Sequence, residues 1–503
     1  MSSFKLPLSN DSTRRSIFTW IRQKLWIEKF YNLPGAALLL LASLGLGWIA
    51  IEVDLKLSFI ILGGLIALPV LYAIVAKPEF GVLTLLIMAN LLFFILRFGV
   101  EFPLGTLLDG LQYLLILGFI LGQRSRPDWS VFKGPVSTMV LVWVSFNILQ
   151  VLNPVADSRL AWVYTVRSAA IVVLMYFVFK YQIRTIQFIR IILKLWLFIS
   201  VWAALLAYKQ EYIGFSASEQ AYLDSDPSIG SLLFIDGHWR KYGLFADPVI
   251  FSYNMVIASL ICVALLTGPL TLWKKISLAG MIFLFISAML FSGTRGAYVL
   301  LPAGLALFAI LKFNRAILFF SVIAGFIMAV LIMIPTSNPT LYRFQTAFRP
   351  TNDASFNLRA QNQKKIQPFI QSHPIGGGLG AAGSWGKRFS PDSFLANIPP
   401  DGGYVRVAME TGWVGLLLLC TLVFLIIRAG IINFYRIKNP ELKTYCLAMT
   451  LSVFVLNIGN YPQEALVQFP LNIYIYLMAA LIDVTYRLDQ QQQAAAAKLL
   501  PVS

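Results

Sequence analysis

Three arginines stand at the edges of long apolar runs of the sequence. Arg295 lies in SGTRGAYV between two such runs, Arg240 lies in GHWRKYGLFADP ahead of a third, and Arg167 lies in WVYTVRSAA near the start of a fourth. A guanidinium group stays charged in proteins, and its planar fork fits phosphate oxygens bidentately. We therefore predict that the three arginines bind a polyanionic head group at a membrane surface.

A simpler interpretation exists for each arginine taken alone. An arginine at the end of a membrane span often reaches lipid phosphate and acts only as an anchor. The surroundings of Arg295 favour a binding site, because Gly293 and Gly296 allow close backbone approach. The helix expected after Arg295 would also direct the positive end of its dipole at a bound anion.

Two carboxylates could take part in acid–base chemistry near these arginines. Asp401 lies in NIPPDGGYV, between two prolines and two glycines, and is a candidate general base. The alternative is a turn-forming aspartate, since PPDGG is also ordinary turn chemistry. Glu410, about two helical turns further on, is either a second acid or a helix–helix hydrogen-bonding group, and an ionisable residue at that depth is a functional candidate.

The two histidines, His238 and His373, offer further candidates. His373 precedes Pro374 and either caps a helix or serves as an alternative base, while His238 stands two residues before Arg240. Neither histidine has metal-ligand spacing to another His, Cys or Glu. Carboxylates at Asp224, Asp226, Asp236 and Asp247 could bind a metal, but DSDP is also typical of a solvated loop. We predict no metal and no cofactor.

The glycine run in HPIGGGLG could suggest a phosphate-binding loop. The segment GLGAAGSWGKR has no Gly-Lys-Ser/Thr at the required spacing, so that interpretation fails. We expect these glycines to form turns that bring an outer loop back to the membrane.

These candidates must be positioned by membrane helices. Of the 503 residues, 58% are hydrophobic and 13% are charged, which excludes a water-soluble globule and a disordered chain. Apolar runs long enough to cross a bilayer recur along the chain. The fold class is therefore an all-α polytopic membrane protein with about 14 (12–14) transmembrane helices. The net charge of +17 indicates cytoplasmic loops and contact with membrane lipids, and we expect no nucleic acid partner.

The expected spans are about 33–51, 57–76, 80–97, 104–122, 135–152, 162–180, 186–208, 247–267, 274–292, 296–312, 316–335, 403–428, 441–459 and 466–485. With the N-terminus inside, lysines and arginines gather in the inner loops, so both termini are predicted to be cytoplasmic. Two outer loops are long, 209–246 and 336–402, and loops of this length are usually functional or disordered. The second loop is basic, and SFNLRAQNQKKIQPFI predicts a helix in it that stops at Pro374 and the glycines.

Six segments follow from this reading. They are a basic cytoplasmic segment (1–32), N-terminal transmembrane helices (33–208), transmembrane helices with arginine-bearing outer loops (209–335), a large outer lid loop (336–402), C-terminal transmembrane helices (403–486) and a cytoplasmic tail (487–503).

Several segments, in order, resemble the bacterial O-antigen ligase and O-antigen polymerase superfamily. They are RKYGLFADPVIFSYNM, SGTRGAYV, HPIGGGLG after a lid helix, a span containing ETGWVGLLL, and a last span with a polar start. The resemblance covers roughly 160–485. Members of this superfamily act in the inner membrane on undecaprenyl-pyrophosphate-linked glycans at the periplasmic face. They pass the glycan to lipid A-core or to another glycan, or they act on proteins.

The resemblance implies a metal-independent inverting glycosyltransferase of lipopolysaccharide or exopolysaccharide assembly. Arg295, Arg240, Arg167 and Lys241 would bind the pyrophosphate. Asp401 or His373 would be the base, and Glu410, Tyr404 and His238 would contact the acceptor or sugar. The superfamily's ligases usually carry a His-Asn-like pair just before the Glu-x-Gly span, whereas this sequence has PPDGGY there. Ligase and polymerase activity are therefore both compatible with the sequence.

A small-anion transporter, for example of inorganic carbon, is the alternative function. Anion translocation would also use arginines. The charged residues gather at the outer face and not at mid-membrane in both halves, which favours a glycan site over alternating access.

Overall fold

The computed structural model describes residues 33–52, 70–98, 104–225, 227–235, 237–336, 339–348 and 354–499. The chain divides into two compact units, Met1–Thr84 with Tyr113–Leu121, and Leu85–Gln112 with Gly122–Ser503. Every site described below lies within the second unit. The predicted segment 1–32, most of the expected span 57–76, Asp226, Asp236 and the last four residues of the tail lie outside the described residues.

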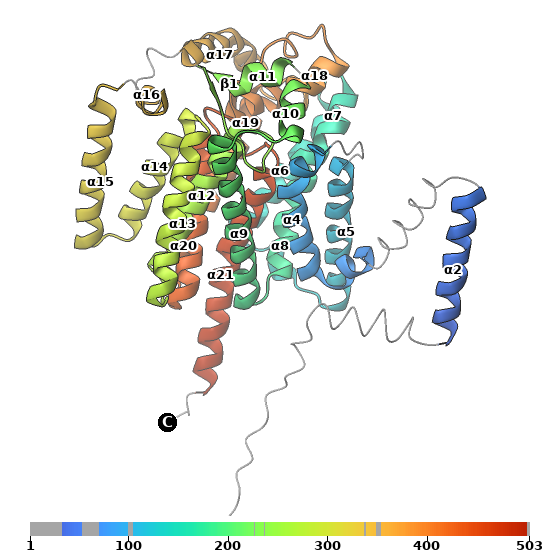
Figure 1. Ribbon diagram of the computed structural model, residues 1–503. Helices are drawn as coiled ribbons and strands as arrows, with labels where there is room; N and C mark the ends of the chain where they lie inside the picture. Colours follow the sequence, from blue (N-terminus) through green and yellow to red (C-terminus); the bar gives the residue numbers. More distant parts are fainter. Residues whose placement is uncertain are drawn as a thin grey trace, which may run out of the picture. The chain divides into compact units, whose positions relative to one another are not determined.

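The described residues are almost entirely helical (Figure 1), which confirms the predicted fold class. The long helices in chain order are α2 (Leu33–Glu52), α4 (Pro78–Leu96), α5 (Leu104–Ser125), α6 (Pro135–Leu149), α8 (Val172–Gln182), α9 (Ile186–Tyr212), α12 (Pro248–Leu266), α13 (Leu272–Phe291), α14 (Arg295–Leu311), α15 (Arg315–Met333), α17 (Ala354–Ser372), α19 (Gly403–Arg436), α20 (Pro440–Gly459) and α21 (Leu471–Leu499). The short elements are η2 (Trp129–Phe132), η3 (Gln150–Leu152), α7 (Arg159–Val166), η4 (Arg167–Ile171), α10 (Ala217–Asp224), α11 (Pro227–Leu233), β1 (Phe234–Ile235), β2 (His238–Trp239), α16 (Pro339–Thr346) and α18 (Gly383–Phe389).

Ten helices in the described part of the chain are long and apolar enough to cross a membrane. They coincide with ten of the expected spans, and α14 is a shorter apolar helix at an eleventh. Helices α2 and α15 lie at two further expected positions. The count of fourteen is therefore not confirmed, while the polytopic helical architecture is.

The last span lies further along the chain than expected. The sequence predicts 466–485, but α21 begins at Leu471 and continues to Leu499. Pro470 immediately precedes the helix, and residues 461–470 form turns ahead of it. The helix continues past 485 because QQQQAAAAK consists of good helix formers, whose polarity does not end a helix.

Helices α12, α20 and α21 form the centre of the second unit. In their apolar windows 78%, 78% and 83% of the residues are buried, against 22% for α13. Helix α12 packs against α9, α13, α14 and α20. Helix α13 is therefore a peripheral helix whose outer surface faces lipid.

Two long loops cover one end of the helices of this unit (Figure 1). The loop after α9 folds into α10, α11 and the hairpin β1–β2, in which Phe234 pairs with Trp239. The loop after α15 contains α16, α17 and α18. The predicted lid helix is α17, and it ends just before Pro374 as the sequence pattern indicates.

A break in α19 joins this lid to the membrane helices. Gly412 has φ 69°, so the helix hydrogen bond from the Val414 N–H is lost, and this N–H donates instead to the Pro374 carbonyl at 3.1 Å. The Glu410 carbonyl, freed by the break, accepts from the Gly378 N–H at 2.9 Å. The glycine run thus joins the lid to α19 by an exchange of backbone hydrogen bonds.

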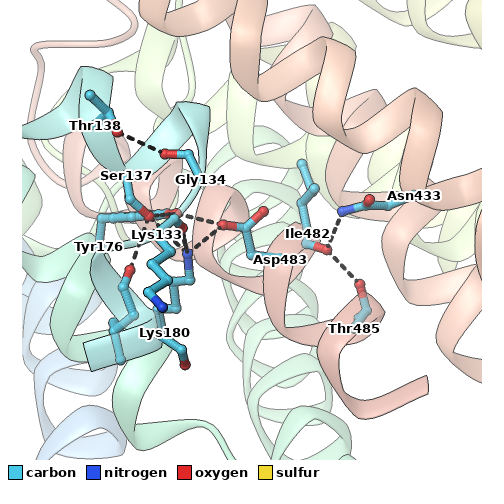
Figure 2. A network of polar contacts seen from close by, with 12 residues as sticks. Lys133, Gly134, Ser137, Thr138, Tyr176, Lys180, Asn433, Ile482, Asp483 and Thr485 are labelled. Carbon is cyan, nitrogen blue, oxygen red and sulfur yellow. Dashed lines mark hydrogen bonds and ion pairs between the residues drawn. The ribbon is translucent and has the colours of Figure 1, made fainter. Parts of the chain in front are cut away.

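Away from the lid, a buried polar network ties α6, α8 and α21 together (Figure 2). The Lys180 ammonium lies 2.9 Å from an Asp483 carboxylate oxygen and donates to the Ser137 hydroxyl at 2.8 Å. The Tyr176 hydroxyl donates to the same carboxylate at 2.5 Å. The two charges compensate each other between helices, which makes their burial tolerable.

Candidate functional site

Arg240 is fixed by the loop that carries it. Its backbone N–H donates to the Leu233 carbonyl at 2.8 Å, which closes the β1–β2 hairpin. Its guanidinium donates to the Ser292 carbonyl at 2.9 Å and to the Thr294 hydroxyl at 2.9 Å. Both acceptors belong to the turn between α13 and α14. The hairpin therefore presents Arg240 to the residues that immediately precede Arg295.

Four arginines line one cavity of about 270 Å³ at this place. Arg240 comes from the hairpin, Arg295 from the first position of α14, Arg343 from α16 and Arg359 from α17. Its other lining residues are Leu232, Ile235, Val249, Gly293, Thr294, Gly296, Pro462 and Gln463. We call this space the arginine cavity. Two of its arginines were predicted from the sequence, and the lid supplies the other two.

The charged side chains among the described residues that line the arginine cavity are all arginines. No acidic side chain stands among the described residues that line it. Burial and, after it, the neighbouring charges of Arg343 and Arg295 together lower the pKa of Arg240 to about 10, although Asp247 opposes this shift. Asp247 itself caps α12 by accepting from the Val249 and Ile250 N–H groups. The cavity therefore favours an anion with several oxygens.

The two predicted glycines keep this space open. Gly293 has φ 58°, and a Cβ there would lie 3.1 Å from Nε of Arg343, which donates to the Gly293 carbonyl at 2.7 Å. A Cβ on Gly296 would lie 3.0 Å from the Tyr253 hydroxyl. Thr294 makes no side-chain cap at the start of α14; its hydroxyl instead accepts from Arg240 and donates to the Pro248 carbonyl at 3.1 Å.

Asp401 lies next to the arginine cavity. Its carboxylate accepts from the Asn362 side-chain amide at 2.7 Å. Asn362 follows Arg359 by three residues, so both lie on one face of α17. Two residues after Asp401, the Gly403 N–H donates to the carbonyl of Gln463, a cavity-lining residue, at 3.1 Å. The lid helix and the turn before α21 thus hold Asp401 beside the arginine cavity.

His373 lies at the other end of α17. Its Nδ1 is 3.0 Å from the Phe369 carbonyl and 2.9 Å from the Ser372 hydroxyl, and its ring stacks on Phe369. Eleven residues of helix separate it from Asn362, which corresponds to roughly 16 Å. The contacts of His373 are those of a helix C-terminus.

Three other residues predicted to bind the substrate, Arg167, Lys241 and His238, lie outside the lining of the arginine cavity. Arg167 forms an ion pair with Asp109, and it does not line the arginine cavity. The Lys241 ammonium lies 3.1 Å from Glu211 and is nearly buried, and His238 approaches the same carboxylate at 3.4 Å. These two side chains form a pair of contacts under the hairpin, outside the cavity lining.

Glu410 belongs to a separate buried ion cluster. Arg406 donates to Glu410 at 3.1 Å and to Glu464 at 2.5 Å, and all three side chains are at least three-quarters buried. Tyr404 donates to the Asn457 carbonyl at 3.0 Å. These contacts connect α19 with α20 and with the turn before α21.

Arg343 and Arg359 are the site residues that sequence reasoning did not assign. Both stand in the long outer loop, whose basic character contradicts the usual distribution of charge across a membrane. That excess was the available signal. It could not distinguish these two from the other lid cations, because the choice depends on how α16 and α17 fold back over the turn before α14.

The comparison with known families agrees with this geometry. Residues 280–420 match the family described as O-antigen ligase. No curated protein matches the chain. The matched region includes Arg295, Arg343, Arg359 and Asp401. Over residues 280–420, this membrane protein is therefore similar to the O-antigen ligase family.

Proposed function

We propose that this protein transfers a glycan from undecaprenyl pyrophosphate to an acceptor hydroxyl at the periplasmic face of the bacterial inner membrane. The observation that carries the proposal is the arginine cavity at the ends of membrane helices, three of whose four arginines lie in the region that matches the O-antigen ligase family. The acceptor is lipid A-core in a ligase and a further glycan in a polymerase.

The arginine cavity would bind the pyrophosphate of the donor. When the glycosidic bond breaks, negative charge grows on the leaving pyrophosphate oxygen. Guanidinium groups that are already fixed in place stabilise this charge more in the transition state than in the ground state. Arg240 is held by two acceptors of the turn before α14, and Arg343 is held by a third, so their positions do not depend on the ligand.

Asp401 would act as the base. The acceptor oxygen attacks the anomeric carbon from the face opposite the pyrophosphate, and its proton passes to the Asp401 carboxylate. The new carbon–oxygen bond forms as the bond to the pyrophosphate oxygen breaks, and that oxygen keeps the electron pair. The product has the inverted configuration, and undecaprenyl pyrophosphate leaves. Asn362 would orient the carboxylate through its hydrogen bond.

Arg240→Ala and Arg295→Ala test the proposal in a glycan-transfer assay with a lipid-linked donor. Both variants should lose transfer while their amounts in the membrane stay normal. Arg388→Ala is the matched control, because Arg388 is a lid arginine that packs near Trp385 and Phe389 and does not line the cavity. Normal transfer by both cavity variants would contradict the pyrophosphate role.

A further inference from the structure

A second, larger cavity lies at the opposite end of α12. It has a volume of about 600 Å³ and is bounded by the first turns of α9, α13 and α20 and by the end of α12. Val249 of α12 lines the arginine cavity and Leu265 lines this one. Sixteen residues of helix separate them, which corresponds to about 24 Å. The two cavities therefore belong to opposite leaflets of the bilayer.

The walls of this cavity combine cations with apolar side chains. Arg190, Lys194 and Lys274 supply the positive charge. The one carboxylate in the lining, Glu441, is bound by Arg190 through two hydrogen bonds of 2.5 and 2.6 Å, so the lining carries two positive charges in excess. The apolar part consists of Leu193, Leu197, Leu265, Leu270 and Leu278.

The position of the cavity along the membrane normal matches that of lipid head groups. Lys274 lies in the first turn of α13, next to Trp273, whose side chain is 81% exposed. Tryptophan and lysine at the end of a span mark the membrane–water interface. Helix α13 is also the peripheral helix of this region, so a lipid that diffuses in the leaflet reaches the cavity from the side.

We propose that this cavity binds an anionic phospholipid. Basic pockets between membrane helices hold lipid phosphates in this way, and the leucines accommodate the start of the acyl chains. Lys194 and Lys274 are both exposed, and they are the cavity cations that contact the phosphate; Arg190 is occupied by Glu441. The site is distinct from the arginine cavity, and its occupation does not depend on the proposed transferase activity.

Native mass spectrometry of the purified protein titrated with phosphatidylglycerol tests the proposal. Each removed lysine should weaken binding about fivefold, so Lys194→Ala/Lys274→Ala should weaken it about 30-fold. Lys275→Ala is the matched control, because Lys275 is the next residue of α13 but does not line the cavity, and it should bind as the wild type does. Ser277→Trp should also lose the lipid, because it fills the cavity without changing its charge.

Three results would overturn the lipid site. The first is equal affinity for phosphatidylcholine and phosphatidylglycerol with the same acyl chains, which would mean that the head-group charge does not contribute to binding. The second is unchanged phosphatidylglycerol binding in both the double-lysine variant and Ser277→Trp, or an equal loss in Lys275→Ala. The third is displacement of the lipid by millimolar inorganic phosphate, which would identify free phosphate as the ligand.

Discussion

At the scale of single residues, the lid arginines carry the sharpest prediction. A charge-assisted hydrogen bond contributes about 1.5–3 kcal/mol, so Arg343→Ala and Arg359→Ala should each lower kcat/KM for transfer about 10- to 100-fold. Arg167→Ala should have a smaller effect, because Arg167 pairs with Asp109 outside the cavity. Steady-state kinetics with a lipid-linked donor measure both. An Arg167 variant more impaired than the lid variants would reverse the assignment of the third arginine.

The base can be assigned by comparing three variants. Asp401→Asn should lower kcat by at least 100-fold with little change in the donor KM, since general-base catalysis contributes about 10²–10⁴-fold. Asn362→Ala should lower kcat less than Asp401→Asn does, because Asn362 only orients the carboxylate. His373→Ala should retain transfer. If His373→Ala is inactive while Asp401→Asn is active, the base is the histidine.

The sequence predicted part of this site and could not predict the rest. Arg240 and Arg295 were recognisable because each stands in a short motif at the mouth of a span. Lys241 was included as the neighbour of Arg240, but successive residues of an extended segment point to opposite sides. Its side chain accordingly reaches Glu211, which no sequence spacing connects to it. Arg343 and Arg359 depend on how the lid folds.

At the scale of elements, the break in α19 at Gly412 fixes the position of the lid against that helix. A Cβ on Gly412 would lie 2.1 Å from the Pro374 carbonyl oxygen, and its φ of 69° is itself unfavourable for other residues. Gly412→Ala should therefore lower the Tm of the purified protein and impair transfer. Gly280→Ala, in α13, has open space around its Cβ and should leave both unchanged. A wild-type Tm for Gly412→Ala would show that the break is not required.

The helices themselves were largely predictable from apolar run length. Their ends were less so, and the differences have physical causes. Helix α14 (Arg295–Leu311) matches the expected span 296–312 within one residue at each end. Helix α21 begins late because the turn before it carries Gln463 and Glu464, which contact the start of α19 and Arg406. Such contacts cannot be predicted from hydropathy alone.

At the scale of the whole molecule, the buried network of Figure 2 should govern stability. Removal of one partner of a buried ion pair typically costs about 3–5 kcal/mol, because the other charge remains buried. Lys180→Met should thus lower the Tm clearly, while Lys180→Met combined with Asp483→Leu should recover most of the loss. Thermal unfolding in detergent measures both. A double variant as unstable as the single one would show that the pair is not the cause.

The orientation in the membrane is testable with single cysteines. The two cavities lie at opposite ends of α12, and the distribution of positive charge predicts that the arginine cavity faces the periplasm. Ser390→Cys, just after α18 of the lid, should react with a membrane-impermeant maleimide in intact spheroplasts. Lys274→Cys should react only after the membrane is opened. The reverse pattern would place the lid in the cytoplasm.

The central claim is that the arginine cavity binds the pyrophosphate of the lipid donor. The most direct measurement is the affinity of the purified protein, in nanodiscs, for undecaprenyl pyrophosphate, compared between wild type, Arg295→Ala and Arg388→Ala. The account predicts that Arg295→Ala weakens binding at least tenfold, while Arg388→Ala, a lid arginine outside the cavity, binds as the wild type does. Equal affinity of Arg295→Ala and the wild type would contradict it.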